Sequence, residues 1–379
     1  MYKIWEVFWR FLGLGFISFG GPAAHIGYFQ KTFVQKLNWI DEQSYAKLIS
    51  LSQFLPGPGS SQIGFAIGLR RAGIFGGIAA FLGFTLPSFF LLYFLATVNT
   101  ENSSDLFGGV VHGLKLLAVV VVADAVLSMF KAFCKDGISI AIAVLTSTGL
   151  LLFPSLWMQM GALVLAAFLG MIYHKTDRYD TITKVRVNML PLILFFMLFI
   201  GLPMLTFVSQ WIEIFSDFYQ SGSLVFGGGH VVLPLLQQTL GDAISTDNFL
   251  LGYAAAQAVP GPMFSLAAFL GADLSADNQF FGAVIATVGI FLPGFLLLLS
   301  FQGAWESLAA RPKVAGAVWG INAAVVGLLL SALYNPVFIS AVLTPADMAL
   351  VIVGYFALTA MRVPIVMLVL GFGVIGMLL

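Results

Sequence analysis

The chain has 379 residues, of which 60% are hydrophobic and only 9% are charged. Since a soluble domain is about 25% charged, this composition excludes an ordinary soluble protein and indicates an integral membrane protein. There are 17 basic residues (lysine plus arginine) and 17 acidic residues (aspartate plus glutamate), so the net charge is zero. The overall charge therefore does not indicate a nucleic-acid partner.

The chain opens with an apolar run, residues 1–16, that contains Glu6 and Arg10 and has no small-residue cleavage site. It is therefore predicted to belong to the mature chain and not to a signal peptide. Glu6 and Arg10 lie four residues apart, so we expect them to pair with each other.

Apolar runs then recur that approach the length of a bilayer crossing, which takes about 20 residues. The runs predicted to cross are 73–98, 107–130, 137–153, 158–173, 189–207, 281–301, 314–334, 347–361 and 364–379. The expected fold class is an all-α polytopic membrane protein.

Four short motifs occur twice, in the same order and 204 to 207 residues apart. The pairs are FGGP at 19–22 with FGGG at 226–229, QFLPGP at 53–58 with QAVPGP at 257–262, LPSF at 86–89 with LPGF at 292–295, and HGLK at 112–115 with WGIN at 319–322. This order indicates an internal duplication. We expect a first repeat over 1–174, a basic linker and extra crossing helix over 175–207, and a second repeat over 208–379.

Loop charges predict that the two repeats point in opposite directions, because lysine and arginine collect on the cytoplasmic side. The basic linker 175–186 and the Arg70–Arg71 pair are predicted to lie inside, and the acidic loop 101–105 outside. In the second repeat the equivalent loops carry the opposite charge, with Asp273 to Asp277 outside and 311–313 inside. The sequence therefore predicts an inverted-topology repeat.

Glycine and proline interrupt each repeat twice, in the FGGP and PGP motifs and their counterparts. Lys31, Lys36 and Lys47 lie between the first two breaks and would be stranded outside if the flanking segments crossed fully. We therefore predict that each break is the tip of a re-entrant helical hairpin with arms of about 12 residues, or about 18 Å, which reach the midplane.

Such tips leave backbone N–H groups without intrahelical partners, and a restarting helix points its positive dipole end at the break. Together these features predict an anion site, whereas the alternative is a simple packing kink. The residues predicted to bind substrate are Gly20, Gly21, Gln53, Gly57, Gly59, Ser60, Ser61, Lys115, Gly227, Gly228, Gln257, Gly261 and Ser265.

Ionisable residues within the apolar runs are costly and usually functional. Lys115 suits a dianion passing the helix tips, although it could instead extend to the outer interface. Asp124 is a candidate either for carrying a coupled proton or for pairing with a basic group on another helix. His25 and His230 follow breaks and are candidates for coupling or gating, with plain hydrogen bonding as the alternative.

Enzyme signals are missing from the sequence. It contains no GxSxG, HExxH, Walker or CxxC motif, and four scattered histidines with the single Cys134 make no plausible metal set. We therefore expect neither enzymatic activity nor a metal or other cofactor.

The motifs resemble those of the chromate ion transporter family, in its long form with two homologous halves, over residues 5–379. The resemblance implies a prokaryotic multi-pass transporter of the cytoplasmic (inner) membrane that exports chromate and confers resistance, with sulfate as the isosteric competitor. The matching residues are Gly20, Gly21, Pro22, His25, Pro56, Gly57, Pro58, Gly59, Ser60, Gly227, Gly228, Gly229, Pro234, Pro260, Gly261 and Pro262. Met263 and Phe264 stand where the first half has Gly59 and Ser60, so the halves need not contribute equally.

The sequence thus predicts secondary transport of a tetrahedral oxyanion, chromate first. An oxyanion channel, or a membrane enzyme acting on a lipid phosphate, stays as an alternative. The expected partners are chromate or sulfate, the lipid bilayer and a coupled proton, with a homodimer left open and nucleic acid excluded.

Overall fold

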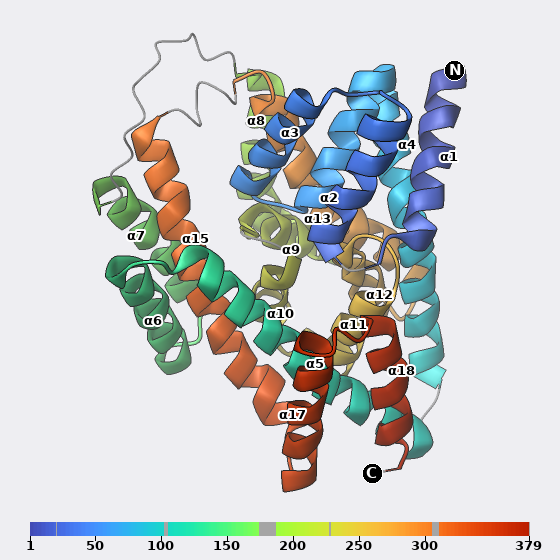
Figure 1. The fold of residues 1–379 in the computed structure, drawn as a ribbon, viewed down its shortest axis with the longest axis vertical. Coiled ribbons are helices and arrows are strands. Elements are labelled where there is room, and N and C mark those ends of the chain that lie inside the picture. Colours follow the sequence, from blue (N-terminus) through green and yellow to red (C-terminus); the bar gives the residue numbers. More distant parts are fainter. Residues whose placement is uncertain (20, 102–104, 174–186, 227–228, 305–310, 379) are drawn as a thin grey trace.

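The computed structural model describes residues 1–19, 21–101, 105–173, 187–226, 229–304 and 311–378, and every regular element in these ranges is helical (Figure 1). The first repeat contains α1 (Tyr2–Ile17), α2 (Gly21–Phe29) with its π-helical continuation Gln30–Lys36, α3 (Glu42–Phe54), α4 (Gly59–Glu101), α5 (Asp105–Phe133), α6 (Gly137–Leu152) and α7 (Leu156–Tyr173). The basic linker 175–186 lies outside the described residues.

Helix α8 (Met189–Gly201), extended by the 3-10 turn Leu202–Val208, precedes the second repeat. That repeat contains α9 (Gln210–Leu224), turn Gly229–Val231, α10 (Val232–Leu240), turn Gly241–Ala243, α11 (Thr246–Ala258), turn Met263–Ser265, α12 (Leu266–Asp273), α13 (Gln279–Phe301), α15 (Pro312–Ala332) with its π-helical end Leu333–Phe338, α16 (Ile339–Ala341), α17 (Pro345–Thr359) and α18 (Ile365–Gly376).

The predicted all-α polytopic fold is confirmed. Among the described residues, the helices long and apolar enough to cross a membrane are Gly59–Val98, Gly108–Phe133, Met189–Val208, Gln279–Phe301 and Pro312–Ala341. The remaining predicted runs form shorter apolar helices, α6, α7, α17 and α18. The chain is therefore a multi-pass membrane protein.

Helix α4 is two helices joined by a sharp bend, because Ala72 and Gly73 leave the helical conformation and Gly73 has a φ of 66°. The arm 59–71 turns back onto the arm 74–101, where the absent side chains of Gly68 and Gly76 allow close backbone contact. With this division, the helices of the first half can be matched in chain order with helices of the second half, with α8 between the halves and the short α16 unmatched. The repeat itself stays a prediction. The sidedness of the two repeats in a membrane stays a prediction.

The starts of α1 and α3 gather at the bend of α4. Arg71 Nη2 lies 2.9 Å from Glu6 Oε2, and the Arg71 guanidinium stacks over Trp39 at 4.8 Å from the ring centroid. The expected pairing of Glu6 with Arg10 is therefore wrong, because the bend brings Arg71 over the first turns of α1 while the Arg10 side chain is exposed.

The two repeats interlock through their last helices. Helix α5 of the first repeat packs against α17 and α18 of the second, and α15 of the second packs against α6 and α7 of the first. Helices α5 and α15 also pack on each other, and Figure 1 shows them crossing. Each repeat thus completes its packing with the other, and neither forms a separate body.

Small residues allow these crossings to be close. A Cβ added to Gly113 on α5 would lie 1.9 Å from the Phe372 carbonyl oxygen, and one added to Gly320 on α15 would lie 1.9 Å from that of Ala166. Gly113 and Gly320 occupy equivalent positions of the repeat, so the duplication preserves the contact as well as the motif. This is the small-residue packing by which membrane helices associate without a hydrophobic driving force.

We expect Gly113→Ala to destabilise the folded protein by about 1–3 kcal/mol, because the added methyl group must push α5 away from α18. Gly108→Ala on the same helix is the control, since a Cβ there would meet nothing within 4 Å. Thermal unfolding of both variants in detergent measures the difference. Equal melting temperatures for the two variants would contradict the close contact.

Candidate functional site

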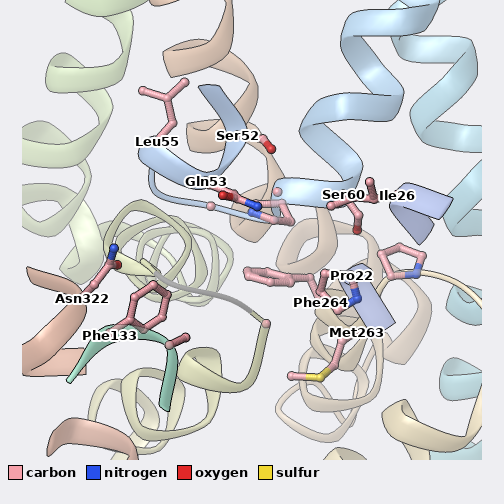
Figure 2. A pocket seen from close by; sticks show the side chains of 16 residues that line it. Pro22, Ile26, Ser52, Gln53, Leu55, Ser60, Phe133, Met263, Phe264 and Asn322 are labelled. Carbon is pink, nitrogen blue, oxygen red and sulfur yellow. The ribbon is translucent and has the colours of Figure 1, made fainter. Parts of the chain in front are cut away.

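The four breaks converge on one cavity of about 430 Å³. The first break contributes Pro22, the second 57–60, the third Gly229 and the fourth 262–264. Figure 2 shows Pro22 and Ser60 on one side of this cavity and Asn322 and Phe133 on the other. Motifs that lie up to 240 residues apart along the chain thus form one site.

The proline–glycine turns hold the two repeats together at this cavity. The backbone N–H of Gly57 donates to the Val225 carbonyl at 2.7 Å, and that of Gly261 donates to the Ser18 carbonyl at 3.0 Å. Each turn is therefore bonded to the chain just before the glycine-rich break of the opposite repeat. Gly57 and Gly261 have φ of 114° and 108°, which residues with a side chain rarely adopt.

Both turns also press against the middle of a long helix of the other repeat. A Cβ on Gly57 would lie 3.0 Å from Cα of Gly294 in α13, and one on Gly261 would lie 2.9 Å from Ser88 Oγ in α4. Ser88 Oγ in turn lies 2.7 Å from Ser265 Oγ. These contacts explain why glycine follows the first proline in both turns.

Unpaired donors face the cavity from the start of α4. The first hydrogen bond of this helix runs from Gln62 N to the Pro58 carbonyl at 2.9 Å, so the N–H groups of Gly59 and Ser60 precede the helical ladder. Behind this wall, the Ser61 hydroxyl is buried and has no partner among the described residues. Since α4 also points its positive dipole end at this position, the site favours a negatively charged ligand.

The second repeat supplies a similar but less polar wall. The bond from Ser265 N to the Pro262 carbonyl, at 2.9 Å, leaves the N–H groups of Met263 and Phe264 ahead of the helix that follows. Their side chains line the cavity where the first repeat has Gly59 and Ser60. The halves therefore contribute unequally, and no charged side chain is found among the described lining residues.

His25 holds the second break in place. Its Nε2 lies 3.1 Å from the Ser18 carbonyl, which can only accept, so Nδ1 accepts from the Ser60 hydroxyl at 3.1 Å. His25 is fully buried and is not among the lining residues. This geometry makes it a positioning residue for Ser60.

His230 has different surroundings from His25. Its Nδ1 lies 2.9 Å from Tyr253 Oη and 3.4 Å from Gln257 Nε2, and Gln257 Nε2 also contacts Met263 Sδ at 2.8 Å. The two histidines therefore do not occupy equivalent environments.

The structure brings together part of the predicted substrate site. Gln53, Gly57, Gly59 and Ser60 line the cavity. Behind it lie Ser61, Gln257, Gly261 and Ser265, and Gly21 begins α2 next to Pro22 with a φ of 74°. Gly20, Gly227 and Gly228 lie outside the described residues.

Lys115 and Asp124 on α5 do not line the cavity. Lys115 Nζ lies 2.7 Å from Asp247 Oδ1, at the start of α11. Asp124 forms no ion pair with another described residue. Lys115 therefore does not supply positive charge to the site in this conformation.

Asn322 on α15 lines the cavity, and sequence reasoning did not select it as a site residue. Its side-chain oxygen is buried without a partner among the described residues. The internal repeat could have identified Asn322 as a candidate, because Asn322 in WGIN occupies the position of Lys115 in HGLK.

We expect Gly57→Ala to cost about 1–3 kcal/mol of stability, because alanine is strained at a positive φ and its methyl group would meet Gly294. Gly59→Ala is the comparison, since Gly59 is not at positive φ and a Cβ there would lie 3.3 Å from the Ser52 carbonyl oxygen. Thermal unfolding with purified variants measures both. A melting temperature for Gly57→Ala at or above that of Gly59→Ala would overturn this account of the turn.

A model of the chromate transporter family matches residues 5–207 and 212–377. A chromate transport protein of Pseudomonas aeruginosa is 27% identical over 335 residues, which cover 86% of this chain and 79% of that protein. A probable chromate transport protein of Synechococcus elongatus is 27% identical over 349 residues, covering 87% and 84%.

The uncharacterised transporter YwrA of Bacillus subtilis is 25% identical over 168 residues, which cover 92% of that protein but only 43% of this chain. No solved structure matches the chain. Both blocks of the family match contain the glycine and proline breaks that form the cavity. The chain therefore belongs to the chromate transporter family, whose named members are transporters and not enzymes.

Proposed function

We propose that this chain exports chromate, a tetrahedral dianion, across the cytoplasmic membrane and that sulfate competes for the same site. The observation that carries this proposal is the single cavity to which all four breaks contribute, with the unpaired N–H groups of Gly59 and Ser60 at its wall. Family membership supplies chromate as the candidate substrate.

Uncharged donors suit a transporter of a dianion. Backbone N–H groups can surround the oxygens of a tetrahedral anion, and the helix dipole stabilises its charge at a distance. Because sulfate has the same shape and charge as chromate, these donors would accept both anions.

The position of the cavity supports loading from the cytoplasm. Ala132 and Phe133, at the end of α5, line the cavity, and Lys131 and Lys135 flank them. Loop charges predict this end of α5 to lie inside. An anion entering here would therefore come from the cytoplasm, as export requires.

A carrier is favoured over a channel by the one-sided lining. Gln53 and Asn322 line the cavity, but their counterparts in the repeat, Gln257 and Lys115, do not. A channel needs access from both sides at once. In a proton-coupled mechanism Asp124 is the candidate proton carrier, because His25 and His230 are both engaged in hydrogen bonds.

Chromate uptake into inside-out membrane vesicles tests this proposal, with and without a proton gradient and with sulfate as competitor. We expect saturable uptake that sulfate inhibits and that Ser60→Ala with Ser61→Ala weakens. Ser60→Ala removes the bond by which His25 positions the start of α4, and Ser61→Ala removes the buried hydroxyl without a partner behind the cavity wall. A loss of about tenfold corresponds to one hydrogen bond to a charged group, about 1.5–3 kcal/mol. Ser50→Ala is the control, because its exposed hydroxyl bonds only the Ala46 carbonyl.

Uptake that is unchanged in the double variant would place the site elsewhere. Uptake that rises linearly with chromate concentration would favour a channel. Absence of chromate uptake by the wild-type protein would refute the proposed substrate.

A further inference from the structure

The central cavity is symmetric at its core and asymmetric at its mouth. The core is lined by equivalent residues of both repeats, such as Gly59 with Met263 and Ser60 with Phe264. The mouth is lined by Gln53 and Asn322, whose counterparts lie away from the cavity. We call the side of the cavity at Gln53 of α3 and Asn322 of α15 open, and the equivalent side, at Gln257 of α11 and Lys115 in the first half of α5, closed.

Helix packing shows the same asymmetry. Helix α11 packs along α5 and α18, whereas α3, its counterpart, makes no comparable packing with α15 or α7 over the described residues. A second, apolar cavity of about 510 Å³ instead separates residues 54–56, at the end of α3, from Met171 of α7 and Ile321 of α15. Helix α11 is therefore packed on α5 and α18, whereas the end of α3 is separated from the equivalent helices α15 and α7.

An ion pair joins the repeats at the closed side. Lys115 Nζ of α5 lies 2.7 Å from Asp247 Oδ1 of α11, and the Lys115 side chain is 9% exposed while that of Asp247 is 64% exposed. A buried ammonium group needs a counter-charge, because leaving it unpaired costs far more than the pair contributes. Any movement of α11 away from α5 must therefore provide Lys115 with another anion.

We propose that the Lys115–Asp247 pair is the gate on the closed side, and that in the opposite-facing conformation Lys115 leaves Asp247 and binds the transported anion at the mouth. The repeat supports this assignment, because Asn322 holds the same position at the open mouth and lines it. This inference rests on the transport function proposed above.

The exchange explains both opening and release. The dianion supplies the counter-charge that Lys115 loses when α11 moves, so an occupied site opens more readily than an empty one. Asp247 remains the competing carboxylate and displaces the anion when the gate closes again. The mouth at Asn322 has no such competition, because its amide carries no charge.

A second side-chain contact between the repeats serves as the matched control. His112 Nε2, one turn before Lys115 on α5, lies 2.8 Å from Asp347 Oδ1 of α17. This contact also joins the repeats, but the packing of α17 on α5 has an equivalent in the packing of α6 on α15. The His112–Asp347 contact therefore lies in helix packing that is present on both the open and the closed side. We expect this contact to be unchanged when the gate opens.

Cysteine accessibility tests the gate without requiring any substrate. In a Cys134→Ser background, Ser52→Cys reports on the open mouth, and Ala256→Cys, at the equivalent position, reports on the closed one. Both side chains are buried within the fold, but Ser52 lines the cavity and Ala256 does not. A membrane-impermeant thiol reagent should modify Ser52→Cys and spare Ala256→Cys. Adding Asp247→Asn should increase modification of Ala256→Cys on the order of tenfold, whereas His112→Gln should not.

Charge exchange separates gating from misfolding. Lys115→Asp combined with Asp247→Lys restores the pair and should protect Ala256→Cys again. Protection of Ala256→Cys that persists in Asp247→Asn would overturn the gate.

The ligand role of Lys115 has its own measurement. Lys115→Gln should both expose Ala256→Cys and abolish chromate transport in vesicles, while Lys115→Arg should retain transport. Wild-type transport by Lys115→Gln would overturn the role of Lys115 as an anion ligand. If the wild-type protein transports no chromate, the proposed substrate fails, but accessibility in Asp247→Asn still decides the gate.

Discussion

Backbone N–H and carbonyl groups that are buried away from water need hydrogen-bond partners, and the arrangement of this protein follows from that constraint. Broken helices within an apolar protein leave N–H and carbonyl groups that hydrocarbon cannot satisfy. This chain meets the requirement by bonding each proline–glycine turn to the other repeat, through Gly57 N to Val225 O and Gly261 N to Ser18 O. The donors that remain, at the start of α4, lie at a cavity, which we propose to be the anion-binding site.

Duplication makes this arrangement possible. Because the two repeats carry equivalent turns and glycine contacts, each offers the acceptors and the close-packing surfaces that the other lacks. The repeats are also held together because α5 of the first packs on α18 of the second, and α15 of the second packs on α7 of the first. Helices α1 to α4 and α9 to α13 then hold the breaks between these crossings.

Departures from the repeat carry the functional information. Where both halves agree, as at the PGP turns, the residues maintain the architecture. Where they differ, as at Lys115 and Asn322 or at Ser60 and Phe264, the two sides of the site acquire different chemistry. Under the proposed function, a perfectly symmetric site would bind the anion equally from both sides, so these differences are the proposed basis for a direction of transport.

The sequence by itself determined the membrane class, the positions of the apolar helices, the four breaks and the repeat that relates them. It also selected Gln53, Gly57, Gly59 and Ser60, which line the cavity, because composition, helix breakers and repeated motifs are local signals that can be read from the sequence alone. These features follow from the free energy of each segment in the bilayer, which its own residues largely set.

Only the tertiary structure decided how those segments meet. Asp247 lies 132 residues from Lys115 along the chain, and no local pattern assigns one to the other. Helix crossings likewise decide three other features. They are the packing of α5 and α15 on helices of the opposite repeat, the pairing of Glu6 with Arg71, and the place of Asn322 in the cavity. The physical reason is that an ion pair or a glycine contact is decided by the relative position of two helices, and each helix's own sequence is compatible with several such positions.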